Sequence, residues 1–342
     1  MANAYISGTG FYVPPRVVTN EDLAARGIDT THDWIVQRTG IEQRRFADEG
    51  VGTSDLAVKA AEDAILRAKI EKKDLDLIIF ATLSPDFCFP GSGVLLQKKL
   101  GLADGDAPKF VPAMDIRNQC SGFLYGLATA SAMVKSGQAK HVLLVGAETH
   151  SAALDFTTRG RTVSSLFGDG AGAVVVSATD EDRGIRGTWL GADGRFADAL
   201  CQKIFDISKR PYIPVNAEGV GQVAPEMMFA HMDGKIVFKH AVEKMCLALM
   251  QACWATNVDP GQIDLFFFHQ ANMRINQYVA QQLKLPEEKV VHNIQRYGNT
   301  TAATIPILLA EAERDGKLRR GMKVAMVAFG SGFTWGSSLV DW

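Results

Sequence analysis

Residues 109–134, KFVPAMDIRNQCSGFLYGLATASAMV, carry the pattern on which the predicted fold depends. An apolar run ends at Ile116, a short polar link leads to Cys120, and small and apolar residues follow from Ser121. This order predicts a strand, a tight turn and a helix that is buried on most sides. Cys120 then lies at the helix N-terminus, where free N–H groups and the helix dipole favour a thiolate. The stretch indicates a nucleophile, although a lone cysteine is more often a small buried hydrophobe.

The composition is that of an ordinary globular protein. The 342 residues are 47% hydrophobic and 22% charged, and the formal net charge is −2. A chain of this length predicts two domains or one duplicated domain. The near-neutral charge gives no reason to expect a nucleic acid partner, although a local basic patch can still bind an acidic protein.

The cysteines and the N-terminus indicate the compartment. The five cysteines are scattered, without a C-x-x-C pair or a Cys/His cluster at metal-ligand spacing. We therefore expect a reducing environment and no structural metal. Residues 1–14 lack a basic start and a long apolar run, and no apolar run reaches the length of a membrane span. The expected location is the cytoplasm, without membrane contact.

The second half of the chain repeats the pattern of the first. In both halves an amphipathic helix, a polar turn and a buried strand are followed by a helix, a strand, a turn, a small-residue helix and another buried strand. The matching ranges are 56–84 with 241–272 and 95–148 with 279–332. Alternating strands and helices predict an α/β fold with a mostly parallel sheet in each half and helices on both faces.

The duplication divides the chain into residues 1–180 and residues 181–342. It places Cys120 and Asn299 at nearly equivalent helix starts in the two halves. Residues 193–231 match nothing in the repeat and are rich in proline, glycine and aromatic residues. We interpret them as an inserted loop region that caps a site.

Two polar segments of the second half complete a candidate site. His269 follows the apolar run 265–268 and is followed by Gln270, so it lies at the C-terminal end of a strand, where α/β sheets place their sites. Alone, such a histidine is more often a satisfied core residue. Asn299 stands in YGNTT, which is also a normal turn and helix cap. The three residues together, at equivalent places of a duplicated fold, indicate a site. The G-x-G-x-G of residues 168–172 does not predict nucleotide binding, because no helix or Lys-Ser/Thr follows it.

From residue 4 to 342 the sequence resembles the β-ketoacyl-acyl carrier protein synthase III (KAS III) branch of the thiolase-like condensing enzymes. The motifs that carry the resemblance are DWIVQRTGI (33–41), CSGF (120–123), FGDGAGA (167–173), HQANMRI (269–275), YGNTTAA (297–303) and FGSGFTWGSSLV (329–340). The resemblance implies a thiolase-like fold, in which two duplicated halves with mostly parallel mixed sheets stack as five layers, αβαβα.

The resemblance also implies a Cys-His-Asn site. Cys120 attacks an acyl-CoA thioester and forms an acyl-enzyme. Malonyl on acyl carrier protein (ACP) then loses CO₂, and His269 Nε2 and the Asn299 amide donate hydrogen bonds to the enolate oxygen. The N–H groups of Cys120 and of the Gly330-Ser331-Gly332 loop form a second oxyanion hole, and Phe329 lies beside the thiol. CoA and 4'-phosphopantetheine thioesters are substrates, and neither a cofactor nor a metal is expected.

Further positions follow from the same family pattern. The implied CoA and pantetheine contacts are Trp34, Arg38, Arg159 and Asn272. An indole suits adenine and guanidinium groups suit phosphates, although Trp34 and Arg38 are also simple i, i+4 neighbours on a surface helix. Lys239 and Arg274 match the rim that docks the acidic carrier protein. Gln281 and Gln282 stand where relatives can carry lysine, so the identity of the carrier is not carried over.

Three features concern the acyl pocket. Ser331 stands where many relatives have glycine, which keeps the backbone donor and is expected to narrow the site. The 193–231 insertion is longer than in compact relatives, so the acyl-chain length is not carried over. Phe89 matches a position that closes the acyl pocket of the partner subunit, which implies a homodimer.

Three alternatives remain beside a KAS III enzyme of fatty acid synthesis. A papain-like protease has the same Cys, His, Asn chain order, but the expected signal peptide and Cys-Gly-x-Cys-Trp context are missing. An inactive partner subunit disagrees with the presence of all three site residues. A KAS III-like enzyme of secondary metabolism, which joins two acyl chains or forms an ester, stays open.

Overall fold

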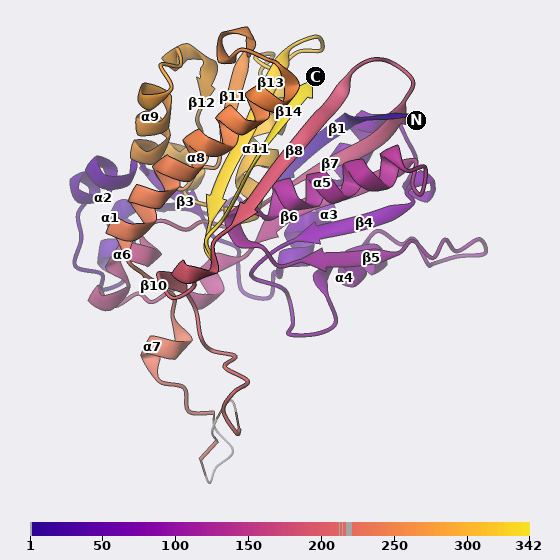
Figure 1. The fold of residues 1–342 in the computed structure, drawn as a ribbon. Coiled ribbons are helices and arrows are strands. Elements are labelled where there is room, and N and C mark those ends of the chain that lie inside the picture. Colours follow the sequence, from indigo (N-terminus) through magenta and orange to yellow (C-terminus); the bar gives the residue numbers. More distant parts are fainter. Residues whose placement is uncertain (1, 212, 214, 217–220) are drawn as a thin grey trace.

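Two five-stranded sheets form the frame of the protein (Figure 1). The computed structural model describes all residues except 1, 212, 214 and 217–220. The first sheet has the order β1 (Asn3–Tyr12), β7 (Gly170–Thr179), β6 (His141–Glu148), β4 (Leu77–Ala81), β5 (Ala113–Ile116). The second has the order β8 (Gly184–Ala192), β14 (Thr334–Asp341), β13 (Lys323–Gly330), β11 (Leu265–Phe268), β12 (Val290–Val291).

The two strand orders are equivalent, position by position. In each sheet the first strand and the third are antiparallel to the second, and the third, fourth and fifth strands are parallel. The strands of each sheet therefore run mostly in one direction, with β7 and β14 reversed. The predicted duplication and the predicted mostly parallel mixed sheets are both confirmed.

Helices cover the sheets in five layers, as predicted. The central layer consists of α5 (Gly122–Lys135) and α11 (Thr304–Arg314), whose apolar residues form one core with the inner faces of both sheets. The outer face of the first sheet packs on α3 (Thr53–Ala68) and α4 (Ser92–Lys99). The outer face of the second packs on α8 (Gly234–Thr256) and α9 (Met273–Gln282).

Strand alternation explains why these strands are apolar throughout. In β11, Phe267 belongs to the central core, whereas Phe266 and Phe268 pack against the outer helices. Both faces of the strand are buried, so no position needs a polar side chain. The small residues of α5 have a related cause: a Cβ on Gly126 would lie 2.4 Å from Leu144 Cδ1, so this helix approaches the first sheet very closely.

Smaller elements surround the end of the sheets where the site lies. The hairpin of β2 (Val17–Thr19) and β3 (Gln43–Arg45) carries α1 (Asn20–Ala25) and α2 (His32–Thr39) between its strands. The short helices α6 (Arg161–Ser164) and α10 (Ile294–Tyr297) lie in the first and second half of the chain. In the described part of the chain, no helix is both long and apolar enough to cross a membrane.

The predicted insertion has a base and a projecting arm. Its base is a short antiparallel pair, β9 (Leu200–Cys201) with β10 (His231–Met232). Between them the chain, which includes α7 (Pro225–Met228), extends away from the body of the protein (Figure 1). The predicted cap is therefore correct only for the base, and residues 212, 214 and 217–220 of the insertion lie outside the described residues.

Candidate active site

A cavity of about 250 Å³ lies where the two halves meet, and it brings the three predicted site residues together. Cys120, His269 and Asn299 all line it. Its remaining walls come from α2 and α6 at the mouth, from α8 and α9, and from the base of the insertion. The lining residues include Trp34, Arg38, Leu166, Phe167, Leu200, Met232, Val237, Phe238, Ala241, Met245, Asn272, Phe329 and Gly330.

Two tight turns, one from each half, form the floor. The 3₁₀ turns Gln119–Ser121 and Thr301–Ala303 directly precede α5 and α11 and pack against each other. Gln119 and Thr301 both have left-handed backbones, with φ of 45° and 50°. A β-branched residue in this region is strained, and such strain concentrates at functional sites. Counted from the helix starts, Cys120 is equivalent to Ala302, so the predicted equivalence with Asn299 is wrong by three residues.

Cys120 sits in a crowded and poorly solvated place. A Cβ on Gly330 would lie 3.0 Å from the Cys120 nitrogen, so glycine lets β13 approach the turn. Burial raises the pKa of the Cys120 thiol to about 12, and the Glu148 carboxyl also raises it, while hydrogen bonds from the backbone of Cys120 and Ser331 and from the Thr301 hydroxyl lower it. The expected thiolate at the helix N-terminus is therefore wrong for the resting protein, because desolvation outweighs the nearby donors.

His269 follows β11 and presents one free ring nitrogen. Its amide donates to the Val327 carbonyl (2.8 Å), which continues the sheet pairing past the end of the strand. Nδ1 lies 2.7 Å from Thr304 Oγ1, and Nε2 has no hydrogen-bond partner among the residues that the structure describes. Burial lowers the pKa of His269 to about 3, so the ring is neutral at physiological pH. The Thr304 hydroxyl is also 3.0 Å from the Thr301 carbonyl oxygen, which gives it two acceptors to choose between.

Asn299 is held by its backbone and by its own side chain. Its backbone N–H donates to the Leu166 carbonyl (2.8 Å), and its backbone carbonyl accepts from the Gly168 N–H (3.1 Å). Its Oδ1 accepts from Thr301 N–H (2.8 Å). The side-chain amide is thereby oriented, and the NH₂ group is the end that remains for a ligand in the cavity.

The FGDGAGA motif braces the loops around the site. The Asp169 carboxylate is buried and accepts from the amides of Ser151 (2.9 Å) and Ala47 (2.7 Å) and from the Ser151 hydroxyl (2.5 Å). Gly170 begins β7, so the glycines continue into a buried strand. The motif therefore has a structural role in this fold, and sequence reasoning did not find the role of Asp169.

At the mouth, the Trp34 indole lies against two guanidinium groups. The Cζ atoms of Arg38 and Arg161 lie 4.3 Å and 4.0 Å from its ring centroid. Arg159 is absent from the cavity walls and pairs with Asp155 (2.7 Å) beside the Phe229 ring. Arg161 is not among the lining residues either, but it contacts the Trp34 ring and the family pattern did not indicate it, so Arg159 as a CoA contact stays a prediction.

The other predicted contacts lie at the rim. Asn272 lines the cavity, but its Oδ1 caps α9 by accepting from Arg274 N–H (2.9 Å), and its Nδ2 donates to the Arg38 carbonyl (3.0 Å). Both ends of this amide are engaged, so it connects α9 to α2. Lys239 and Arg274 are exposed on α8 and α9, and the Arg274 guanidinium lies 5.8 Å from the ring centroid of Phe238, a lining residue.

The pocket residues divide into three situations. Phe329 lines the cavity, as predicted. Ser331 is not among the lining residues: its hydroxyl donates to the Leu200 carbonyl and ties the base of the insertion to the loop after β13. Its expected narrowing of the site stays a prediction. Phe89 is 84% exposed and lies outside the cavity of its own subunit. In the described part of the chain, no three His, Cys, Asp or Glu side chains are grouped so that they could hold a metal ion.

A duplicated αβαβα fold with a cysteine, an imidazole and an amide on one cavity defines a thiolase-like condensing enzyme, which is an acyltransferase. The family profile described as 3-oxoacyl-[acyl-carrier-protein] synthase III matches residues 114–194, and the profile of its C-terminal part matches residues 253–342. The crystal structure of the synthase III from Aquifex aeolicus VF5 is 40% identical in sequence, with a TM-score of 0.86, and the match covers 99% of this chain and 100% of that chain. The chain belongs to the 3-oxoacyl-[acyl-carrier-protein] synthase III family, as the sequence motifs predicted.

Two further structures are similar over nearly the whole chain. The β-ketoacyl-[acyl carrier protein] synthase III from Thermus thermophilus is 40% identical, with TM-score 0.86, over 99% of each chain. The priming β-ketosynthase of the R1128 polyketide biosynthetic pathway is 29% identical, with TM-score 0.86, over 99% of this chain and 96% of that chain.

Proposed function

We propose that this protein condenses an acyl-CoA primer with malonyl-ACP and so initiates fatty acid or related acyl-chain synthesis. The observation that carries the proposal is the arrangement around one cavity of the Cys120 thiol, the unpartnered Nε2 of His269 and the oriented Asn299 amide. The proposed reaction uses two thioester substrates and no cofactor, and the proposed location is the cytoplasm.

The first step is transfer of the acyl group to Cys120. The sulfur attacks the thioester carbonyl, the carbon–sulfur bond to CoA breaks, and the thiol proton ends on the released CoA sulfur. In the free protein the N–H groups of Cys120 and Ser331 favour negative charge on the Cys120 sulfur. Because they lie beside the sulfur, they are the donors that hold the tetrahedral oxyanion. Because the resting thiol is neutral, these donors act mainly on the charge that develops during the reaction.

The second step is loss of CO₂ from malonyl-ACP, which leaves an enolate on the ACP thioester. The enolate carbon attacks the acyl-Cys120 carbonyl, the bond from that carbonyl carbon to the Cys120 sulfur breaks, the β-ketoacyl group leaves on ACP, and the sulfur takes a proton from solvent. The enolate oxygen receives hydrogen bonds from Asn299 Nδ2 and from His269 Nε2. His269 must carry its proton on Nε2 for this role, and that tautomer is favoured when the Thr304 hydroxyl donates to Nδ1 (2.7 Å). Removing one such donor typically slows catalysis by about 10²–10³-fold.

The mouth of the cavity fits the handle of both substrates. Trp34 with Arg38 and Arg161 offers an aromatic face and two cations for the nucleotide end of CoA. The exposed Lys239 and Arg274 supply positive charge beside the opening for an acidic carrier protein. Arg159 pairs with Asp155, so the proposed contact of its guanidinium with CoA requires this ion pair to open.

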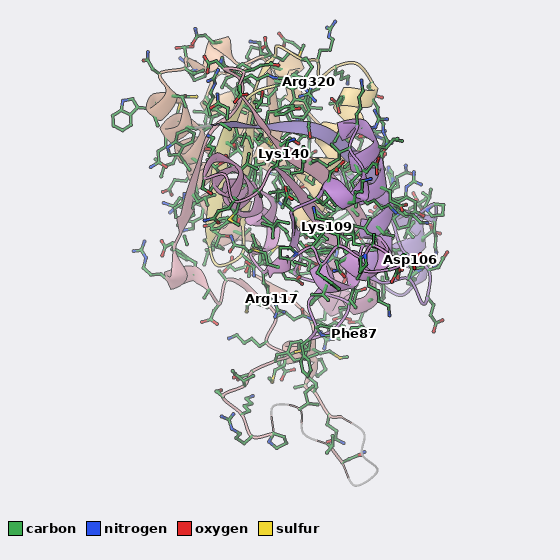
Figure 2. All side chains as sticks on the ribbon, turned by 90° about the vertical axis from the view of Figure 1, so that its right-hand side faces the viewer. Phe87, Asp106, Lys109, Arg117, Lys140 and Arg320 are labelled. Carbon is green, nitrogen blue, oxygen red and sulfur yellow. The ribbon has the colours of Figure 1, made fainter. Side chains whose placement is uncertain are left out.

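A homodimer is also proposed, through the open edge of the first sheet. The edge strand β5 is flanked by exposed apolar residues, including Phe89 (84% exposed) and Phe110 (79% exposed). Figure 2 looks onto this side, with Lys109 and Arg117 labelled before and after β5. An exposed edge strand with aromatic neighbours is a normal site for pairing with a second copy. Light scattering tests this: a mass of 37.1 kDa, that of one chain, would remove the dimer.

A second candidate is a related enzyme of secondary metabolism. The base of the insertion, through Leu200 and Met232, forms part of the cavity wall, so the insertion can adapt the pocket to other acyl groups. One similar structure is a priming ketosynthase of a polyketide pathway. A panel of acyl-CoA primers, scored by the mass of the acyl-enzyme, separates the two candidates.

The central experiment measures the two half-reactions separately. Intact mass after exposure to acyl-CoA reports acylation of Cys120, and CO₂ release from malonyl-ACP reports decarboxylation. We expect His269→Ala and Asn299→Ala to impair decarboxylation more than acylation. An unmodified Cys120 with every primer tried would remove the covalent mechanism, and equal loss of both steps would refute the assigned roles of His269 and Asn299.

A further inference from the structure

A second buried imidazole lies behind the nucleophile, and the proposed reaction leaves it unused. His150 follows β6 and is only 8% exposed. Its Nε2 lies 2.6 Å from Thr301 Oγ1, and its ring packs on Phe167, with the centroids 4.5 Å apart. A buried histidine that only filled space would not need so short a bond to a residue of the catalytic floor.

Thr301 connects this imidazole to the reacting sulfur. The residue is fully buried and held at φ 50°, a strained conformation for a β-branched side chain. Its amide orients Asn299 by donating to Oδ1 (2.8 Å). Its 3₁₀ turn packs against the turn that carries Cys120, and its hydroxyl lowers the pKa of the Cys120 thiol. One strained residue thus serves two members of the site with two different groups.

The direction of the hydrogen bonds follows from the number of protons. A threonine hydroxyl has one proton, so when it donates to Cys120 Sγ, its oxygen accepts from His150 Nε2–H. Burial lowers the pKa of His150 to about 3, so the ring is neutral and has one N–H to give. Hydrogen bonds in such a chain polarise one another, so the outer donor strengthens the inner one.

The surroundings of the Cys120 sulfur disfavour the thiolate, and the hydrogen bonds from His150 and Thr301 would have to oppose this. Glu148, at the end of β6, is buried and raises the pKa of Cys120, as does the loss of solvent. His269 on the opposite wall is neutral, so it does not supply positive charge. Extra donors are therefore needed to bring the sulfur into its reactive form.

We propose that His150 is a positioning residue for acylation: it donates to Thr301 Oγ1, and the polarised Thr301 hydroxyl stabilises the developing thiolate of Cys120. The inference rests on the proposed role of Cys120 as the nucleophile. It concerns the acylation step alone and assigns no contact between His150 and substrate.

The test is the pH profile of the rate of Cys120 alkylation by iodoacetamide, recorded below the midpoint where the protein stays folded. Peptide mass follows Cys120 alone, so that the other cysteines do not contribute. His150→Phe removes the donor and keeps an aromatic ring against Phe167. His150→Gln keeps an N–H donor. Thr301→Val and Thr301→Ser form a second matched pair, which removes or keeps the hydroxyl.

We expect the rate at each pH to fall about tenfold or more in His150→Phe and Thr301→Val, because the loss of a hydrogen bond to a charged group raises the pKa of Cys120 by about one unit or more. His150→Gln and Thr301→Ser stay close to the unaltered protein. An unshifted profile in His150→Phe would overturn the proposal, as would equal shifts in His150→Phe and His150→Gln, which indicate packing alone. If Thr301→Val does not fold, the His150 pair still decides. Alkylation needs neither malonyl-ACP nor decarboxylation, so failure of the condensation itself would be seen separately.

Discussion

Replacing Thr304 by valine tests the control of the His269 tautomer. Valine has nearly the shape of threonine but no hydroxyl, so it removes the partner of His269 Nδ1 (2.7 Å) while the ring stays enclosed. Both residues are 2% exposed, so water does not readily replace the lost group. In the unaltered protein the hydroxyl holds the His269 proton on Nε2 when it donates to Nδ1, and on Nδ1 when it donates to the Thr301 carbonyl (3.0 Å). Thr304→Val removes both hydrogen bonds and with them this control.

The size of the effect follows from two limits. One hydrogen bond contributes about 0.5–1.5 kcal/mol to the choice of tautomer, which corresponds to a factor of up to about ten. Complete loss of the Nε2 donor costs about 10²–10³ in rate. We therefore expect Thr304→Val to slow decarboxylation of malonyl-ACP by up to about tenfold, well short of the effect of losing the donor completely. Acylation of Cys120 should change less than threefold, since it does not need this tautomer.

The assay compares single-turnover acylation with CO₂ release at equal protein concentration. Thr304→Ser is the matched control, because it keeps the hydroxyl and should restore most of the rate. Loss of a buried partner also lowers the free energy of unfolding by about 1–3 kcal/mol, which thermal denaturation reports. Decarboxylation at the unaltered rate in Thr304→Val, or the same loss in Thr304→Ser, would show that the hydroxyl does not set the tautomer.

Three further predictions concern stability, CoA binding and the insertion. Burial lowers the pKa of three histidines, to about 3 for His150 and His269 and about 4 for His292. The unfolded chain therefore binds more protons than the folded protein below pH 6.5. Glu148, whose pKa burial raises to about 7, opposes this effect in part. Thermal denaturation should show the free energy of unfolding falling on the order of 2–3 kcal/mol per pH unit between pH 6 and 5, and a flat profile would contradict this. Trp34→Ala should raise the KM for acyl-CoA about tenfold, because the aromatic face beside the two guanidinium groups is lost. The KM for acyl-pantetheine, which lacks the nucleotide, should stay unchanged. Equal effects on both KM values would contradict adenine stacking. Ser331→Gly should speed proteolysis of the arm with acylation changed less than threefold, because the bond to the Leu200 carbonyl is removed; unchanged cleavage would show that this bond does not hold the insertion.

Local sequence pattern was sufficient for the duplicated frame. The apolar runs at 75–83, 141–149 and 265–268 correspond to β4, β6 and β11, because strands covered on both faces carry no polar positions. The small residues after Ser121 correspond to α5, which packs between the sheets. The polar residues at the strand end and before the last helix, His269 and Asn299, were found for the same reason: function interrupts an otherwise apolar pattern.

The details of the site depended on groups far apart in the chain. Cys120 was expected as a thiolate, since a sequence shows the helix start but not the loss of solvent that raises the pKa. The contact of Arg161 with Trp34 was not foreseen, since the backbone turn at Gly160 decides which guanidinium meets the indole. Sequence reasoning did not find the hydrogen bond from the Ser331 hydroxyl, since its acceptor, the Leu200 carbonyl, lies in the insertion.

The sequence by itself determined the two α/β halves, the three candidate site residues and the family, because periodicity and motif are properties of neighbouring residues. Only the tertiary structure decided the protonation of Cys120, the partner of His269 and the link from His150 through Thr301, because hydrogen bonding and desolvation arise where the two halves meet.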